Sequence, residues 1–526
     1  MASRCIKIPT TFGTGSRCWA WFASLLLTAR VCAAQTPPAF QSLTDPDYPG
    51  VPRSTIYAVT VLENSNAPAE GHVRPARLPV FETLCPQYQA GYMGMRPVDR
   101  YPLKLFRGRS INWVNFSFSG KVTVQARVLD LRKVPLDGPV KIFPSACGII
   151  PTVNGNVIKF TLTRPGQYSV EIGPDGYKNG LLIFANPPEK DRPDPGSENY
   201  FILTNATPSE IGSIPASYSG LYFRRGIHDI GACHVPAHVK NIYLEPGAWV
   251  YGSLIMEPGC SSVKIFGRGV LSGARLRYRE SHMIEAVRSD RIDVEGIVIA
   301  DTRYFAVRLL GTNNIVEWVK IVGGWTYNTD GIAAFAGSRI AHCFIWANDD
   351  SIKPYRDNLT ISDCVVWQLN NGAVIQLGWG NARAANVTIR NVDVLRAEWN
   401  NNAANRGIVS CIGDKFGRGG MHGSDSSFLI ENVVTETPVP FIFNIRPNRA
   451  SPDRIHGMIF KNWNVSMDMA RGYPNYIECA DARNPFDGFV FDDFILNGMK
   501  LTETNWIRVG RFVTTNLVEP QFGMRM

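Results

Sequence analysis

The sequence predicts an all-β protein in which an N-terminal antiparallel β-sandwich precedes a right-handed parallel β-helix. Three observations support this fold class: frequent turn residues, short β-rich runs in the first part of the chain, and a recurring apolar pattern in the second. Gly and Pro occupy 47 and 35 of the 526 positions, which disfavours long helices. With 45% hydrophobic and 19% charged residues the chain can bury a large core, and its length favours two domains.

Residues 1–34 are predicted to be a secretory signal peptide. Basic residues precede the apolar stretch 19–27, and small residues follow it at 31–34. The stretch is well short of the ~20 residues that span a membrane, so a cleaved signal is preferred to an anchor. We therefore expect a secreted or periplasmic protein with no membrane association after cleavage. The formal charge of +9 is too small and too scattered to favour a nucleic acid partner.

Eight of the 11 cysteines follow this leader. In an oxidising compartment Cys85 with Cys147, and Cys233 with Cys260, are plausible disulfide pairs, although connectivity does not follow from sequence. No Cys-x-x-Cys pattern indicates zinc.

Residues 35–199 are predicted to form the sandwich domain and a linker. Short β-rich runs at 121–128, 157–162 and 168–172 are separated by Gly, Pro and Asp turns, as in an antiparallel sandwich. A Pro-rich, charged stretch at 186–196 predicts the boundary. The β-helix is expected over 200–526.

The second domain repeats four apolar residues at relative positions 0, 2, 5 and 7. Two inward residues, a corner and two more inward residues describe one strand, a bend and the next strand, and stacked coils of this kind make a parallel β-helix. The second apolar position of each of eight copies is Val294, Val316, Ile340, Ile361, Ile389, Ile430, Phe460 and Phe491.

Three carboxylates are candidate catalytic groups: Asp330, Asp349 and Asp350. Like charges held close together cannot all stay ionised cheaply, so one acid should keep its proton while another acts as a base. Glycosidic cleavage needs such a division of roles. Calcium binding is the rival interpretation, since clustered carboxylates are also ligands of hard cations, and acids that merely occupy turns are another.

The repeat register predicts how these acids meet. Alignment of Ile332, Ile352 and Val374 as inward residues places Asp330, Asp350 and Gly372 at one position on successive coils, with neighbouring strands ~4.8 Å apart. Asp349 would point away in a regular strand, so a bend or bulge is needed to bring all three acids together.

Other polar and aromatic side chains nearby are candidates for sugar binding. Lys353 and Gln376 could bond to a sugar hydroxyl or orient a carboxylate, although Lys353 could equally be a solvated surface charge. Aromatic faces stack on sugars but also cover sheets. The candidate substrate-binding residues are Lys353, Gln376, Trp379, Tyr327, Asn328 and Trp325.

These motifs resemble glycoside hydrolase family 49, the dextranase and isopullulanase family. The similarity is carried by Asn328-Thr-Asp-Gly, Asn348-Asp-Asp-Ser-Ile-Lys and Ile375-Gln-Leu-Gly-Trp, with further likeness at 241–252 and 269–273, and it spans roughly 215–450. The resemblance implies an inverting hydrolase without metal or cofactor, with Asp349 as general acid and Asp330 and Asp350 activating water. Position alone is compatible with either retention or inversion.

We therefore expect an enzyme that cleaves internal bonds of a polysaccharide, an α-glucan of dextran or pullulan type, and that is a monomer. The related polygalacturonases usually carry a Gly-His-Gly motif, whereas this chain has Gly372-Ala-Val-Ile-Gln-Leu-Gly. Three alternatives stay open: a hydrolase of another polysaccharide, polygalacturonase-like enzymes included; a lyase that uses calcium; and a non-catalytic carbohydrate-binding β-helix.

Overall fold

The structure is a computed structural model of the chain. It describes residues 40–41, 50–63, 75–86, 103–377, 384–403, 405–411, 427–446, 455–471, 473–478, 486–501, 507–509 and 513–518. The expected signal peptide lies outside these residues. No helix within them is long and apolar enough to cross a membrane. Residues 39–526 form one compact unit, so the expected domain boundary near 199 stays a prediction.

The N-terminal part consists of two sheets that are almost entirely antiparallel, as expected for a sandwich. One sheet contains β1 (Phe40–Gln41), β5 (Ser110–Phe118), β11 (Leu181–Asn186), β10 (Gly166–Ile172) and β7 (Val140–Phe143), with β4 (Phe81–Leu84) beside β5. The other contains β3 (Pro75–Leu78), β2 (Tyr57–Glu63), β6 (Val122–Val128), β9 (Val157–Leu162) and β8 (Thr152–Asn154). The pair β11–β5 is parallel, so the expected all-antiparallel pairing is wrong at this one place.

Four 3-10 turns and one short helix accompany the strands. They are η1 (Leu103–Phe106), η2 (Ser145–Cys147), η3 (Gly176–Asn179), η4 (Met469–Arg471) and α1 (Pro208–Gly212).

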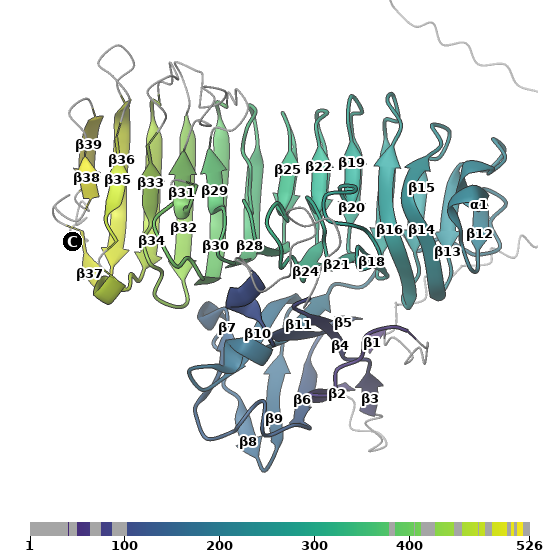
Figure 1. Ribbon diagram of the computed structural model, residues 1–526, viewed down its shortest axis with the longest axis horizontal. Helices are drawn as coiled ribbons and strands as arrows, with labels where there is room; N and C mark the ends of the chain where they lie inside the picture. Colours follow the sequence, from purple (N-terminus) through teal and green to yellow (C-terminus); the bar gives the residue numbers. More distant parts are fainter. Residues whose placement is uncertain are drawn as a thin grey trace, which may run out of the picture. The chain divides into compact units, whose positions relative to one another are not determined.

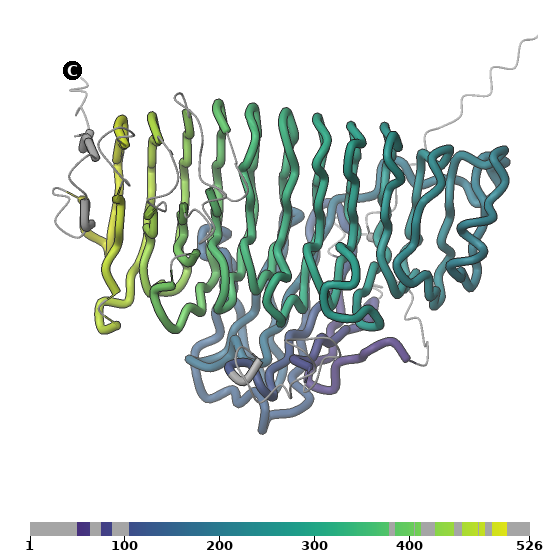
Figure 2. Tube along the Cα trace, turned by 45° about the horizontal axis from the view of Figure 1, so that its top comes forward, coloured from purple at the N-terminus to yellow at the C-terminus, as the bar shows by residue number. Residues whose placement is uncertain are grey.

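From residue 200 onward the chain winds into a parallel β-helix (Figure 1), and Figure 2 shows its successive coils stacked in sequence order. The first ladder of strands comprises β12 (Tyr200–Leu203), β13 (Gly220–Phe223), β15 (Asn241–Leu244), β17 (Val263–Gly267), β20 (Ile292–Glu295), β23 (Ile315–Glu317) and β26 (Arg339–Ala341).

Longer strands continue the first ladder and bend into the second. They are β28 (Thr360–Gln368), β30 (Val387–Ala397), β32 (Phe428–Thr435), β34 (Met458–Val465) and β36 (Phe486–Leu496), followed by β39 (Val513–Val518) beside β36 and a hairpin strand, β37 (Met499–Lys500). The second ladder begins with β14 (Gly226–Val235), β16 (Ala248–Met256), β18 (Val270–Ser272), β21 (Val298–Ala300), β24 (Lys320–Val322) and β27 (Phe344–Ala347).

The third ladder closes each coil. Its strands after β16 are β19 (Ile284–Ala286), β22 (Val307–Leu309), β25 (Ile332–Ala334), β29 (Ala373–Leu377), β31 (Gly407–Cys411), β33 (Phe443–Ile445), β35 (Asn475–Ile477) and β38 (Ile507–Val509). Ile352 lies between β25 and β29 as a bridge to Ile332 and Ile375.

The repeat found in the sequence is confirmed residue by residue. All eight apolar positions named above pair consecutively in the first ladder, from Val294 opposite Val316 to Phe460 opposite Phe491. Their side chains are at most 2% exposed. The inward residues thus fix the register of the stack, because a shift by one residue would turn them away from the core.

The corner between the first two ladders uses one residue per coil in the left-handed conformation. These corner residues are Gly296, Trp318, His342, Asp363, Asn391, Asn432, Asn462 and Asp493. Asn and Asp tolerate this conformation better than other non-glycine residues. Three of the asparagines also form a chain of side-chain bonds, in which Asn462 donates to Asn432 at 3.2 Å and Asn432 to Asn391 at 2.8 Å.

The outer face of the second ladder packs against the first sandwich sheet through an aromatic layer. Trp113 of β5 stacks on Trp249 of β16, with ring centroids 6.1 Å apart, and Phe184 of β11 contacts Phe344 of β27. Beneath them the buried Lys320 ammonium donates to Asn186 and to the carbonyl of Gly296. The apolar layer and this polar anchor together hold the sandwich on the coils.

Neither of the two plausible disulfides is formed. All seven cysteines among the described residues are free thiols: Cys85, Cys147, Cys233, Cys260, Cys343, Cys364 and Cys411. Cys85 belongs to the aromatic layer, whereas Cys147 lies against the apolar core of the sandwich, so these two residues contact different clusters. Burial raises the pKa of the Cys233 thiol to about 11. The thiol therefore stays neutral and packs as a small apolar residue of the core.

Replacement of a corner asparagine tests the left-handed corner. Asn432→Ala should lower the free energy of unfolding by about 1–2 kcal/mol, because alanine is strained in this conformation and the side-chain bonds on both sides are lost. Asn432→Gly should cost less, since only the bonds are lost. Chemical denaturation followed by circular dichroism measures both, and equal stability of the alanine variant and the native protein would contradict the prediction.

Candidate active site

The candidate acids lie in the turn that joins the second ladder to the third. Asp330 precedes inward Ile332 by two residues, and Asp350 precedes Ile352 by two, so the bridge between these isoleucines places both acids at one position on neighbouring coils. The amide of Gly331 donates to the carbonyl of Asp350 at 2.9 Å. The structure therefore stacks the two carboxylates one coil apart, as the repeat register predicts.

On the third coil the expected register was wrong by one residue. Ile352 bridges Ile375 rather than Val374, and the amide of Ala373 donates to Asp350 Oδ1 at 3.1 Å. Gly372 instead lies against the backbone of the acid pair. A Cβ at Gly372 would lie 2.2 Å from the Asp349 carbonyl carbon, and φ is +73°, so only glycine fits here.

A bend at residues 348–349 turns Asp349 toward the other two acids. Asp349 Oδ2 accepts the backbone amide of Asn328 at 3.0 Å and the side-chain amide of Asn371 at 2.7 Å. Its Oδ1 accepts the amide of Asp350 at 3.0 Å. One oxygen from each of the three acids lies within 4.8 Å of the others, so the bend has the expected effect.

Lys353 is the counter-charge of this cluster. Its Nζ lies 2.7 Å from Asp330 Oδ2, forms an ion pair with Asp350 Oδ2, and lies 3.4 Å from the hydroxyl of Tyr355. The side chain is only 6% exposed, so it is not a solvated surface charge. Its ammonium occupies the place between two carboxylates that a divalent cation would need, which favours acid–base chemistry over the calcium interpretation.

Burial and mutual repulsion change the acidity of the cluster. Burial first, and the neighbouring Asp350 second, raise the pKa of Asp349 to about 7. Burial also holds the pKa of Asp330 well above its ordinary value, although Lys353 acts in the opposite direction. Asp330 Oδ1 is buried and has no hydrogen-bond partner. The cluster therefore retains a proton near neutral pH and has an unsatisfied oxygen beside it.

The acids open into a cavity of about 790 Å³, within the size range of ligand sites. Predicted residues that line it are the three acids, Lys353 and Asn328. Residues that the sequence did not single out for this cavity include Asn371, Asn405, Arg279, Tyr304, Phe305, Arg308 and Arg356. Asn371 could have been suspected, because it immediately precedes the glycine stacked on the acid pair.

Three other predicted binding residues, all described by the structure, do not line this cavity. Trp325 is fully buried in the aromatic layer, with its ring 5.1 Å from Trp346, so no face is open to a sugar. Tyr327 is half-buried and is not among the described residues that line the cavity. Gln376 is fully buried, and neither polar atom of its side chain has a partner. Trp379 lies outside the described residues.

Comparison with known proteins gives a consistent set of relatives. No family model matches the chain. It is 25% identical over 484 residues to a dextranase of Arthrobacter globiformis, covering 79% of this chain and 74% of that protein. It is 27% identical over 342 residues to an isopullulanase of Aspergillus niger, covering 57% of this chain and 60% of that protein. The solved structure of Dex49A from Penicillium minioluteum matches with a TM-score of 0.74 at 18% identity, covering 91% of this chain and 96% of that chain, and so shares its fold.

The raised pKa of Asp349 predicts a pH-dependent stability cost. Because its folded-state value of about 7 lies above the ordinary 3.8, the stabilisation from proton binding is complete below about pH 3.8 and is lost as pH rises through 7. Asp349→Asn removes this titration. Its melting temperature should therefore rise relative to the native protein between pH 4 and pH 8, by about 2 °C or more. Differential scanning calorimetry with exposed Asp175→Asn as control measures it, and a constant difference would refute it.

Proposed function

We propose, from the premise that the chain is a dextranase-like glycoside hydrolase of family 49, that it is secreted and hydrolyses internal bonds of an α-glucan. The observation that carries the proposal is the cluster of three carboxylates and one lysine at the floor of a large cavity. Dextranase and isopullulanase relatives support an α-glucan as the substrate class. Secretion is supported by residues 1–34, in which basic residues precede an apolar stretch and small residues follow it.

Asp349 is the proposed general acid. Its pKa of about 7 keeps it substantially protonated at neutral pH. Three amide donors on Oδ2, two from Asn328 and one from Asn371, hold the carboxyl in one orientation. The proton passes to the glycosidic oxygen as the bond from that oxygen to the anomeric carbon breaks. The departing sugar leaves as a neutral alcohol, and Asp349 is left as a carboxylate.

Asp330 and Asp350 are the proposed water-activating pair. They share one lysine ammonium, which opposes the effect of burial on the pKa of Asp330. The unpartnered Asp330 Oδ1 can accept a proton from a water molecule as that water attacks the anomeric carbon. Lys353 is thus proposed to orient the carboxylates, which is one of the two roles that the sequence left open for it.

Inversion of the anomeric configuration rests on the family resemblance. One oxygen from each acid lies within 4.8 Å of the others, closer than the ~6.5–9.5 Å separation of carboxyl groups typical of inverting enzymes. The configuration of the first product is therefore the decisive measurement for this part of the mechanism.

A second candidate substrate is an acidic polysaccharide, and a specific observation favours it. Arg279, Arg308 and Arg356 line the same cavity as the acids. Arg308 pairs with Glu285, whereas Arg279 and Arg356 have no carboxylate partner among the described residues. Burial and the nearby Arg308 and Arg279 lower the pKa of His282 to about 3, which indicates a positive potential at this end.

A proton NMR time course tests substrate and stereochemistry together. Dextran, pullulan and polygalacturonate are incubated in parallel with the protein, and the anomeric signals are followed before mutarotation. We expect the β-anomer first from one of the two glucans. The α-anomer first would replace inversion by a retaining mechanism, and products from polygalacturonate alone would replace the glucan by the acidic substrate.

The proposed acid also predicts the pH dependence of catalysis. Because Asp349 must be protonated to act, kcat/KM should fall as pH rises through about 7. Asp349→Asn should lower kcat by about 10²–10⁴-fold while substrate binding persists. Steady-state kinetics between pH 4 and 9 provide the test. Full activity of Asp349→Asn, or a rate that keeps rising above pH 8, would exclude Asp349 as the acid.

A further inference from the structure

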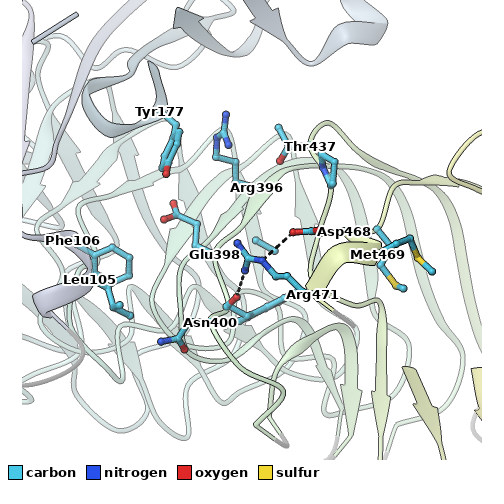
Figure 3. Close-up of a pocket in the computed structure, with 14 residues that line it drawn as sticks. Leu105, Phe106, Tyr177, Arg396, Glu398, Asn400, Thr437, Asp468, Met469 and Arg471 are labelled. Carbon is cyan, nitrogen blue, oxygen red and sulfur yellow. Dashed lines mark hydrogen bonds and ion pairs between the residues drawn. The ribbon is translucent and has the colours of Figure 1, made fainter. Parts of the chain in front are cut away.

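A second cavity, of about 650 Å³, lies where the sandwich meets later coils of the β-helix (Figure 3). Its walls come from η1, from η3, from the end of β30 and the residues that follow it, from the segment after β32, and from residues 467–471, which include η4. Of the two cavities described, this one contains none of the three catalytic acids and is not used by the mechanism above. Its volume falls within the range of ligand sites.

The floor of this cavity is a rigid polar network. Glu398 accepts two bonds from Arg109, at 2.5 and 3.0 Å, and one from the indole of Trp367 at 2.8 Å. Burial acts to raise the pKa of Glu398, but Arg109 and Trp367 hold it below its usual value. Arg396 beside it pairs with Glu171 and lies 4.2 Å from the centre of the Tyr177 ring. The floor is therefore preorganised and electrically balanced.

The far wall carries a second ion pair, between Arg471 and Asp468, beside side-chain donors that are not used by the described residues. Arg471 Nε lies 3.0 Å from Asp468 Oδ2, and Nη1 donates to the carbonyl of Trp399 at 2.8 Å. No described residue accepts a bond from Arg471 Nη2 or from the side-chain amide nitrogen of Asn400. Since every charge of the lining is paired, the cavity favours a neutral ligand that is rich in hydroxyl groups over an ion.

Exposed apolar side chains flank this polar floor. Leu105 is 42% exposed and Met469 is 61% exposed, and Figure 3 shows them on opposite sides of the cavity with Glu398 between them. A pyranose ring presents apolar C–H faces as well as hydroxyl edges. Apolar rims around paired polar groups match both of these surfaces.

Hydrogen bonds connect residues of the two cavities. The backbone amide of Asn400 donates to Asn370 Oδ1 at 3.1 Å, and the adjacent Asn371 donates to the catalytic acid Asp349. Asn405, which lines the catalytic cavity, donates to Asn371 at 3.3 Å, while Arg406 donates to Asn400. The two cavities are therefore neighbours that share a short network of hydrogen bonds.

We propose that this second cavity binds the same neutral α-glucan as the catalytic cavity and holds one stretch of a polymer while another stretch is cleaved. The inference rests on the proposed function for the identity of the ligand. Two linked sites raise the affinity for a chain that spans both through effective concentration, and leave a short ligand that fills one site unaffected. The second cavity therefore favours polymers over short oligosaccharides.

The test compares a polymer with its short analogue: dextran with isomaltotetraose, and pullulan with panose. Two variants of the full chain alter the second cavity, the rim pair Leu105→Ser/Met469→Ser and Arg471→Ala. We expect each to raise KM for the polymer about fivefold or more, with a correspondingly lower polymer-to-oligosaccharide ratio of kcat/KM. The rim pair loses no hydrogen bond, so it keeps the test valid if Arg471→Ala unfolds locally. Arg339→Ala, which removes a similarly exposed arginine from its ion pair with Glu317, is the matched control.

Affinity electrophoresis through gels containing dextran or pullulan separates the two proposals. Catalytically impaired Asp349→Asn should be retarded by the polymer, and the rim variants in the same background should migrate faster. An unchanged kcat/KM ratio with unchanged retardation would overturn the second site while leaving the hydrolase proposal intact. Retardation that depends on the rim, without hydrolysis of either glucan, would overturn the proposed function and leave the site. Absence of both retardation and hydrolysis would overturn both.

Discussion

In-register stacking of parallel coils is the constraint on which the carboxylate cluster depends. Neighbouring strands lie ~4.8 Å apart, so Asp330 and Asp350, at one position on adjacent coils, are held together by the core that stacks Ile332 on Ile352. They have no freedom to separate without breaking that core. Their repulsion is instead offset by the ammonium of Lys353, which pairs with both. The packing that stabilises the fold thus also produces the unusual acidity of the site.

The pattern of inward residues predicted the ladder and most of the acid cluster. A side chain that points into the core has to be apolar, so these positions can be recognised in the sequence. The eight apolar positions pair as expected, and the stacking of Asp330 on Asp350 follows from the same register. The pattern failed on the next coil, where Val374 and Ile375 are both apolar. Either residue can be aligned inward, and the shift was decided by the close approach of Gly372 to the acid pair.

Other features depend on contacts between distant segments, which a single sequence does not reveal. Trp325 is a large aromatic close in sequence to the acids, and its ring is buried in the aromatic layer, where it contacts Phe106 of the N-terminal part. The Lys353 ammonium could in principle bond to a sugar hydroxyl, but in the structure it forms ion pairs with two carboxylates from different coils. Asn405 lies at the cavity through its hydrogen bond to Asn371, from which it is separated by 34 positions in the sequence. The chemistry of the site was therefore easier to predict than its walls.

The sandwich docks on a restricted set of coils, and this has a mechanical consequence. Coil residues of the aromatic layer run from Trp249 to Leu395, and the coils that carry the three acids lie within that range. In a solenoid each coil contacts mainly its neighbours, so unfolding can begin at an end and spread coil by coil. The docked sheet contacts several central coils at once and so stabilises them against unfolding one by one. Fraying of the terminal coils can then stop before it reaches the acids, so the active centre can outlast the ends of the molecule.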